Sequence, residues 1–227
     1  MKGVFIMRGY RISLIRHGLT EANNTGMYIG CNTDLPLSPE GKEAILSKMD
    51  EFEYPKVERV YTSPLLRCTQ TCDILFPDRQ VVVMDELKEL NLGDFDGKTV
   101  DELIDRKDYK DWLKGGINNS APNGETIQEL VVRSYNALTK IIVNMMDEEF
   151  SHCAIVTHSG IITNMLTCFG MPKLNPNEIN IGAGEGAEIL VTADMWQRSQ
   201  AFEILGKVPY LQDEDDFNRF ENDEYYG

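Results

Sequence analysis

The stretch Arg11-Ile-Ser-Leu-Ile-Arg-His-Gly18 decides both the fold and the site that this sequence predicts. Its apolar part, Ile12 to Ile15, is short and ends abruptly in polar residues, which is typical of a buried strand that opens into a loop. In open α/β sheets, ligands bind just outside the carboxyl ends of strands. Arg16 and His17 therefore lie where an imidazole can attack phosphorus while a guanidinium holds the phosphoryl oxygens. On this stretch alone, a strand-end histidine with one backbone hydrogen bond is an equally good interpretation.

Strand-like and helix-like segments alternate along the rest of the chain. This alternation predicts the α/β class, as a three-layer sandwich in which helices cover both faces of a mostly parallel sheet. No repeat, linker or change in composition indicates a second domain, so we expect one domain over residues 1–211 and an acidic tail over residues 212–227. Strands are expected at 12–15, 57–61, 81–84, 154–157, 187–192 and 200–205, and helices at 39–49, 65–75, 100–113, 126–146 and after Gly160 as far as 169.

Composition and charge restrict the class of partner. The chain has 227 residues, of which 42% are hydrophobic and 26% charged, which is ordinary for a soluble globular protein with a substantial core. The net charge of −15 argues against nucleic acid or an anionic membrane as a partner. Residues 213–227 hold seven acids and one arginine, a pattern typical of a solvated terminus. Their four aromatic residues leave open that the tail packs on the domain or on a neighbour in a homodimer.

The cysteines and the amino terminus favour the cytoplasm. Five cysteines with no C-x-x-C pair are most simply reduced thiols. Cys68 and Cys72 are four residues apart but have no matching second pair, so no structural zinc site is expected. The opening Met1 to Met7 is too short for the apolar region of a signal peptide, and no later stretch is long enough to span a membrane. Met7 is an equally good native start.

Three strand ends and one loop carry the groups that phosphoryl transfer requires. Such a site needs a nucleophile, cations that neutralise the phosphoryl oxygens, and an acid for the leaving oxygen. The residues that meet these needs are Arg16, His17, Ser63, Arg67, Glu89 and His158.

Six segments in the right order resemble the histidine phosphatase superfamily, which has the phosphoglycerate mutase-like fold. The nucleophile segment is R-H-G-L-T-E-A-N at 16–23, and the second arginine lies in S-P-L-L-R-C-T-Q-T at 63–71. The acid segment is L-K-E-L-N-L-G-D-F-D-G at 87–97, and the second histidine lies in V-T-H-S-G at 156–160. The remaining matches are Gly30 with D-L-P-L-S at 34–38, and N-G-E-T at 123–126.

The resemblance implies a role for each matched residue. His17 is the nucleophile that becomes phosphohistidine, and Glu89 protonates the leaving alcohol and then activates water. The phosphoryl oxygens are bound by Arg16, Arg67 and His158. The substrate-binding residues that the resemblance implies are Asn23, Gly30 and Ser159. No metal ion or cofactor is expected, because two guanidiniums and a second imidazole already supply positive charge.

Other chemically capable residues are expected to have different roles. Glu86 lies three residues before Glu89 and is a poor substitute for it as the acid. His152 matches no segment of the family, so we expect a surface or core histidine. The aromatic residues expected to pack rather than to enclose substrate are Trp112, Phe169 and Trp196.

Residues 98–122 favour the phosphatase branch of the family over the mutases. Mutases usually carry a longer, basic insertion here that helps to clamp a second phosphate, whereas this segment is short and balances five basic residues with five acidic ones. Leu19, Ala22 and Ser159 differ from the residues that many members of the family have at these positions. The resemblance therefore does not specify the pocket for the leaving group. The sequence therefore predicts a phosphomonoesterase acting on a small phosphorylated metabolite. The alternatives are a cofactor-dependent phosphoglycerate mutase and a non-catalytic module that binds a phosphorylated partner.

Overall fold

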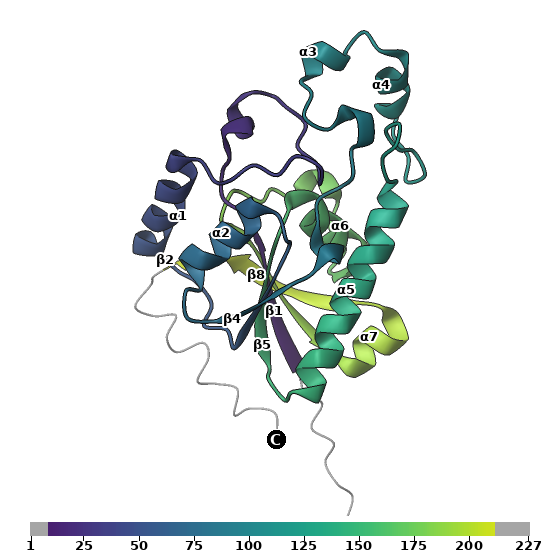
Figure 1. Ribbon diagram of the computed structural model, residues 1–227. Coiled ribbons are helices and arrows are strands. Elements are labelled where there is room, and N and C mark those ends of the chain that lie inside the picture. The colour runs from purple at the N-terminus through teal and green to yellow at the C-terminus, as the bar shows by residue number, and fades with distance from the viewer. Residues whose placement is uncertain (1–8, 212–227) are drawn as a thin grey trace, which may run out of the picture.

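A seven-stranded sheet forms the centre of the computed structural model, which describes residues 9–211 (Figure 1). The strands of this sheet are β1 (Gly9–Arg16), β3 (Arg59–Thr62), β4 (Gln80–Val83), β5 (His152–Thr157), β6 (Gly170–Met171), β7 (Gly186–Thr192) and β8 (Phe202–Val208). Their order across the sheet is β4-β3-β5-β1-β7-β8-β6. Only β7 runs against the others, because it pairs antiparallel with both β1 and β8. A separate small sheet joins β2 (Phe52–Glu53) to β9 (Tyr210–Leu211).

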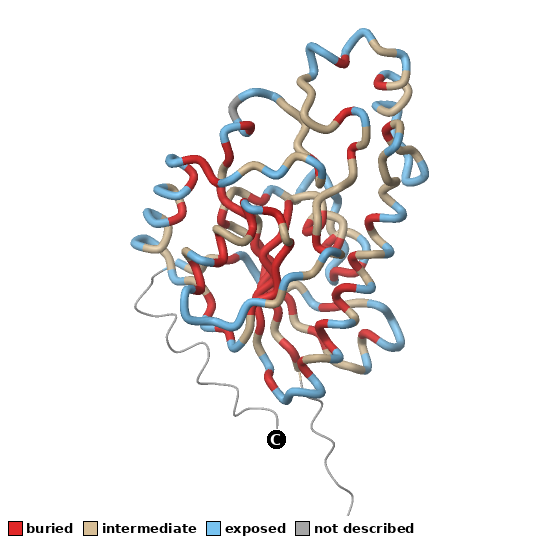
Figure 2. Tube along the Cα trace, viewed as in Figure 1, coloured by how far each residue is buried: buried red, intermediate tan, exposed pale blue. Residues whose placement is uncertain are grey.

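Helices cover both faces of the sheet, as the sequence predicts. On one face, α5 (Ile127–Asp147), α6 (Ser159–Phe169) and α7 (Ala193–Ser199) pack into the larger hydrophobic core. On the other face, α1 (Pro39–Glu51) and α2 (Leu66–Leu75) enclose a second core with β3 and β5. Figure 2 shows that burial is concentrated in the central strands. The predicted α/β fold with a mostly parallel sheet is confirmed.

Local sequence explains where the main helices begin. Ser38 accepts a hydrogen bond from the Gly41 amide, and Pro39 occupies the first turn, so α1 starts where a capping residue and a proline meet. At α5, the Thr126 hydroxyl accepts from the Glu129 amide, while the Glu129 carboxylate accepts from the Thr126 amide. This reciprocal capping box fixes the first turn of α5. Short 3-10 turns are η1 (Glu21–Asn24), η2 (Asp85–Leu87), η3 (Gly93–Phe95) and η4 (Pro176–Glu178).

The prediction of one helix over 100–113 is wrong, because the chain forms α3 (Val100–Leu103) and α4 (Lys107–Trp112) instead. Arg106 is extended at the break, where its guanidinium lies 5.3 Å from the centre of the Phe95 ring and binds Asp108. In one continuous helix, Leu103 and Tyr109 would point roughly 120° apart. The break lets both pack with Phe95 in a small third core.

The closing part of the chain also differs from the prediction. The predicted strands 187–192 and 200–205 correspond to β7 and β8, but α7 separates them. Thr192 begins α7 by accepting a hydrogen bond from the Met195 amide. Within residues 9–211, no helix is both long enough and apolar enough to cross a membrane. The alternative start at Met7 and the acidic tail at 212–227 lie outside the described residues.

Candidate active site

The carboxyl ends of three neighbouring parallel strands form the candidate active site. β1 lies beside β5, and β5 lies beside β3, so that Arg16 is level with Thr157 and Thr62 with Val156. The His17 amide donates to the Thr157 carbonyl oxygen at 3.0 Å, which extends the pairing past the end of β1. The sheet thus brings together His17, Ser63 and His158, which the sequence places at three separate strand ends.

A backbone hydrogen bond determines which nitrogen of His17 carries the proton. Nδ1 lies 2.7 Å from the Gly18 carbonyl oxygen. Because a carbonyl oxygen only accepts, Nδ1 must donate, and Nε2 of the neutral ring keeps a free lone pair. Burial, and secondly the charge of Arg67, lower the pKa of His17 to about 3. Near neutral pH, His17 is therefore uncharged and has Nε2 available as a nucleophile.

His158 lies against His17, with 5.1 Å between the centres of the two rings. It is fully buried, and its Nε2 lies 2.9 Å from the Ser63 hydroxyl oxygen and 3.5 Å from the Cys68 sulfur. Burial and the neighbouring His17 and Arg67 hold its pKa well below the usual value. His158 is thus a neutral imidazole whose orientation is set by Ser63 and Cys68.

Two arginines bring positive charge to this edge of the sheet. Arg67 is only 1% exposed and donates to the carbonyl oxygens of Thr33 at 2.9 Å and Gly30 at 3.0 Å. Arg16 donates to the Ile181 carbonyl oxygen at 2.8 Å. These carbonyls orient the guanidiniums without cancelling their charge. The Nε atoms of both arginines are buried and have no hydrogen-bond partner among the described residues. Such donors are suited to an oxyanion.

Glu89 reaches the same site from the loop that follows β4. Its carboxylate accepts hydrogen bonds from the amides of Leu90 at 2.8 Å and Gly160 at 3.3 Å, the latter in the first turn of α6. Burial raises the pKa of Glu89, although these amides and the charges of Arg67 and Arg133 oppose the change. A raised pKa lets a glutamate carry a proton closer to neutral pH. A side chain at Gly160 would collide with this carboxylate.

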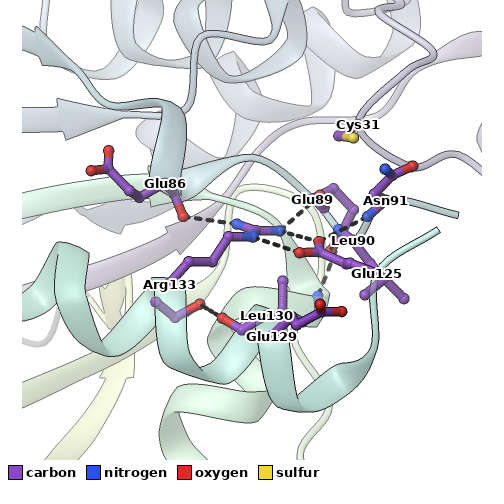
Figure 3. Close-up of polar contacts among 12 residues, drawn as sticks. Cys31, Glu86, Glu89, Leu90, Asn91, Glu125, Glu129, Leu130 and Arg133 are labelled. Atoms are coloured by element: carbon purple, nitrogen blue, oxygen red, sulfur yellow. Dashed lines mark hydrogen bonds and ion pairs between the residues drawn. The ribbon is translucent and has the colours of Figure 1, made fainter. Parts of the chain in front are cut away.

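The alternative acid, Glu86, faces away from Glu89 (Figure 3). Its carboxylate forms an ion pair with Lys140 of α5, and this hydrogen bond lowers its pKa. Glu86 is therefore ionised in a surface pair, whereas the Glu89 carboxylate lies at the first turn of α6, the helix that directly follows His158. This contrast favours Glu89 as the acid.

The three predicted substrate-binding residues have different settings. Gly30 lies in direct contact with the site, because its carbonyl oxygen holds Arg67 and its amide donates to Asp96 at 3.0 Å. The exposed Asn23 caps its own turn, where its side-chain oxygen accepts from the Thr20 amide at 2.7 Å. Ser159 follows His158 as the first residue of α6 and is partly buried.

Arg133 of α5 binds the loop that carries Glu89 and was not predicted as a site residue. A signal was available, because Arg133 lies three residues after Leu130 and four before Ala137, both fully buried on α5. A cation on the apolar stripe of a helix needs a partner inside the protein. By contrast, nothing in the sequence signalled the contacts of Ser63 and Cys68 with His158.

Residues expected to be structural lie away from this edge or pack in cores. His152 begins β5 at its opposite end, with Nε2 3.1 Å from the Ser13 hydroxyl oxygen. Trp196 stacks on Tyr135 at 5.0 Å between ring centres, and Trp112 packs against Phe95 at 5.6 Å. Within residues 9–211, no group of three or more His, Cys, Asp or Glu side chains is arranged to hold a metal ion.

Two histidines and two arginines lie together at the carboxyl ends of the central strands. This arrangement is typical of enzymes that transfer phosphoryl groups through histidine. The sequence model of the histidine phosphatase superfamily (branch 1) matches residues 12–200, and the chain belongs to this family. The family predicted from the six segments is confirmed.

Similar proteins include several phosphatases and also phosphoglycerate mutases. Sedoheptulose 1,7-bisphosphatase of Saccharomyces cerevisiae is 32% identical over 155 residues, which cover 58% of this chain and 55% of that protein. Adenosylcobalamin/alpha-ribazole phosphatase of Escherichia coli is 28% identical over 170 residues, 71% of this chain and 80% of that protein. The phosphoglycerate mutase of Bacillus anthracis shares the fold, with a TM-score of 0.71 at 17% identity over 88% of this chain and 93% of its own. The predicted enzyme class, a phosphoric monoester hydrolase, agrees with the phosphatases among these proteins.

Proposed function

We propose that the protein hydrolyses a small phosphorylated metabolite through a phosphohistidine formed on His17. The observation that carries this proposal is the hydrogen bond from His17 Nδ1 to the Gly18 carbonyl oxygen, because it leaves Nε2 with its lone pair free. The low pKa of His17, about 3, supports an uncharged nucleophile at neutral pH. Arg16, Arg67 and His158 would bind the phosphoryl oxygens, on which negative charge accumulates during transfer.

In the first step, Nε2 of His17 attacks phosphorus and the bond from phosphorus to the substrate oxygen breaks. Protonated Glu89 gives its proton to that oxygen, so that an alcohol leaves rather than an alkoxide. In the second step, ionised Glu89 takes a proton from water as the water oxygen attacks phosphorus and the phosphorus–nitrogen bond breaks. Phosphate leaves, and His17 and protonated Glu89 are restored. The raised pKa of Glu89 supports both roles.

Residues 98–122 support hydrolysis over the mutase alternative. A mutase must hold a second phosphate, which calls for cations without acidic partners. Here Lys107 and Lys114 both form ion pairs with Asp111, and Arg106 pairs with Asp108 at 2.6 Å. Lys110 lies 4.0 Å from Asp105. The basic residues of α4 and the loop after it are thus paired within their own segment. A mutase would need a bisphosphate primer for activity, whereas the proposed hydrolase would not.

Trapping of the phosphoenzyme tests the proposal. The protein is mixed with p-nitrophenyl phosphate, quenched in alkali, in which phosphohistidine survives, and analysed by peptide mass spectrometry. We expect phosphate on His17 and loss of both labelling and turnover in His17→Ala, by several orders of magnitude. Labelling of the His17→Ala variant would refute the assignment of the nucleophile. No labelling of the wild-type protein on a rapid-quench timescale, despite binding of phosphate, would favour the non-catalytic module.

The substrate itself calls for a direct screen of phosphosugars, phosphoserine, nucleotides and ribazole phosphate. Three of these groups correspond to relatives whose names specify a sedoheptulose bisphosphate, phosphoserine and alpha-ribazole phosphate. The cytoplasmic location and a homodimer stay predictions.

A further inference from the structure

Arg133 holds the loop that carries Glu89, although the proposed chemistry does not use it. From α5, its Nη1 donates to the Glu86 carbonyl oxygen at 2.8 Å and its Nη2 to the Glu89 carbonyl oxygen at 3.0 Å. The same guanidinium binds the Glu125 carboxylate through two bonds, from Nη2 at 2.6 Å and from Nε at 3.0 Å (Figure 3). One side chain thus joins α5, the acid loop and the turn before α5.

Glu125 holds the same loop from its other side. Its carboxylate accepts from the Asn91 amide at 2.9 Å, and its own amide donates to the Asn91 carbonyl oxygen at 2.9 Å. The side chains of Arg133 and Glu125 are 22% and 17% exposed, so their ion pair is screened less by solvent than a surface pair. Carbonyl groups at 86 and 89 are therefore held by the cation, and the amide at 91 by the carboxylate.

The carboxylate of Glu89 depends on this backbone for its position. The carboxylate accepts hydrogen bonds from the Leu90 amide, within the held loop, and from the Gly160 amide of α6. Both donors are backbone amides, one in the loop and one in α6. Movement of residues 89 and 90 relative to α6 would therefore break the hydrogen bond between the Glu89 carboxylate and the Gly160 amide. A shift of about 1 Å in a catalytic group is enough to cost on the order of 100-fold in rate.

We infer that Arg133, paired with Glu125, is a positioning residue that holds residues 86–91 so that Glu89 meets the leaving oxygen. This inference rests on the proposed role of Glu89 as the acid. The hydrogen bonds of Arg133 go to Glu86, Glu89 and Glu125 and not to the residues proposed to bind the phosphoryl group, so its loss should impair proton transfer more than attack by His17. The charge of Arg133 also lowers the pKa of Glu89, which gives a second measurable effect.

Two substrates that differ in their need for an acid separate positioning from general damage. Phenyl phosphate has a poor leaving group, whereas p-nitrophenyl phosphate, of nearly the same shape, has a good one. The rate of phosphoenzyme formation is measured for each by rapid quench. We expect Arg133→Met and Glu125→Gln to slow phenyl phosphate roughly 10-fold more than p-nitrophenyl phosphate, a fraction of the ~100-fold or more that a general acid contributes.

Arg59→Met is the matched control, because Arg59, whose side chain is 13% exposed, also forms an ion pair with a glutamate, Glu148 at 2.5 Å, near the opposite end of β5. It should slow both substrates equally or not at all. Arg133→Lys keeps the charge but loses the forked geometry, so the leaving-group contrast should remain. In Arg133→Met, loss of the positive charge should also move the alkaline limit of phosphorylation to higher pH, which Arg133→Lys should not do.

Glu89→Gln, measured in parallel, separates failure of this inference from failure of the proposed acid. A contrast between the two substrates in Glu89→Gln but in neither Arg133→Met nor Glu125→Gln would overturn the positioning role alone. Equal slowing of both substrates in Glu89→Gln would overturn the acid role of Glu89 and the inference with it. A contrast as large in Arg59→Met as in Arg133→Met would also overturn the inference, because any damage to the fold would then produce it.

Discussion

The two ends of β5 each carry a histidine in a different electrostatic setting, fully buried in the case of His158 and partly buried in the case of His152. His152 begins the strand and His158 directly follows it. Burial is the main cause that lowers the pKa of both, to about 4 for His152 and well below the usual value for His158. A lowered pKa therefore does not distinguish the end of the sheet that carries the candidate site from the opposite end.

The charges around the two histidines make the difference. At His158, the neighbouring His17, Arg67 and Arg16 all oppose further positive charge. At His152, Arg11 has the same effect but Glu58 has the opposite one, and the Glu188 carboxylate lies 3.4 Å from Nε2. An excess of positive charge, which Glu89 offsets only in part, suits an incoming phosphate, whereas the cation and the carboxylates around His152 compensate one another. The site is thus identified by the sign of its neighbours rather than by burial.

The largest expected effect is the difference in activity between His158→Gln and His152→Gln. Glutamine keeps a hydrogen-bonding side chain at both positions. His158→Gln should lower kcat about 10²- to 10³-fold, as expected for loss of one group that stabilises transition-state charge. His152→Gln should change kcat less than about twofold. Steady-state kinetics with p-nitrophenyl phosphate measures both. A similar loss in the two variants would remove the distinction between the ends of the strand.

A smaller effect on activity is expected from Gly160→Ala. Its new methyl group would displace the Glu89 carboxylate, so the rate with phenyl phosphate should fall about 10- to 100-fold. Alanine favours a helix more than glycine does, so α6 itself should not be weakened. Gly206→Ala, where the added methyl group meets open space, is the matched control. Unchanged kinetics of Gly160→Ala would show that Glu89 has room to move without loss.

Acid should weaken the fold through His152 without involving catalysis. The pKa of His152 is about 4 in the folded protein and about 6.5 in an unfolded chain, so the unfolded chain binds the proton first as pH falls. Its contribution to stability is therefore complete above pH ~6.5 and is lost as pH falls toward about 4. The free energy of unfolding should fall between pH 7 and pH 4.5 in both proteins. The fall should be about 2 to 3 kcal/mol smaller in His152→Gln than in the wild-type protein.

Urea unfolding at several pH values measures this difference. His17 and His158 have lowered pKa values too, so acid should still weaken the variant, but less steeply. Identical pH dependence of the two proteins would mean that His152 accepts a proton in the folded state as readily as in the unfolded one.

The smallest expected effect is that of chelation. In the proposed mechanism, Arg16, Arg67 and His158 would bind the phosphoryl oxygens, a role that a divalent ion has in other phosphoryl-transfer enzymes. Activity should survive prolonged treatment with EDTA, measured with p-nitrophenyl phosphate before and after dialysis. Loss of activity that magnesium or zinc restores would contradict this prediction.

Local patterns were enough for much of the fold. The apolar runs before His17, Ser63 and His158 predict strands because each is short and ends in polar residues. The order of strands across the sheet and the reversed direction of β7 depend on pairing between segments far apart in the chain. The break at Arg106 also depends on contacts outside its own segment. The sequence of residues 100–113 predicts one continuous helix, but Leu103 and Tyr109 both pack with Phe95 in one core.

By itself, the sequence determined the family, the fold class and the residues proposed for chemistry, because these depend on short segments such as Arg16-His17-Gly18. Only the tertiary structure decided how these residues are held. The proton on His17 follows from a 2.7 Å contact, and the setting of Glu89 follows from Arg133, 44 positions away along the chain. Helical spacing places Arg133 on the buried stripe of α5, but its partner in the loop of Glu89 depends on three-dimensional packing between distant segments.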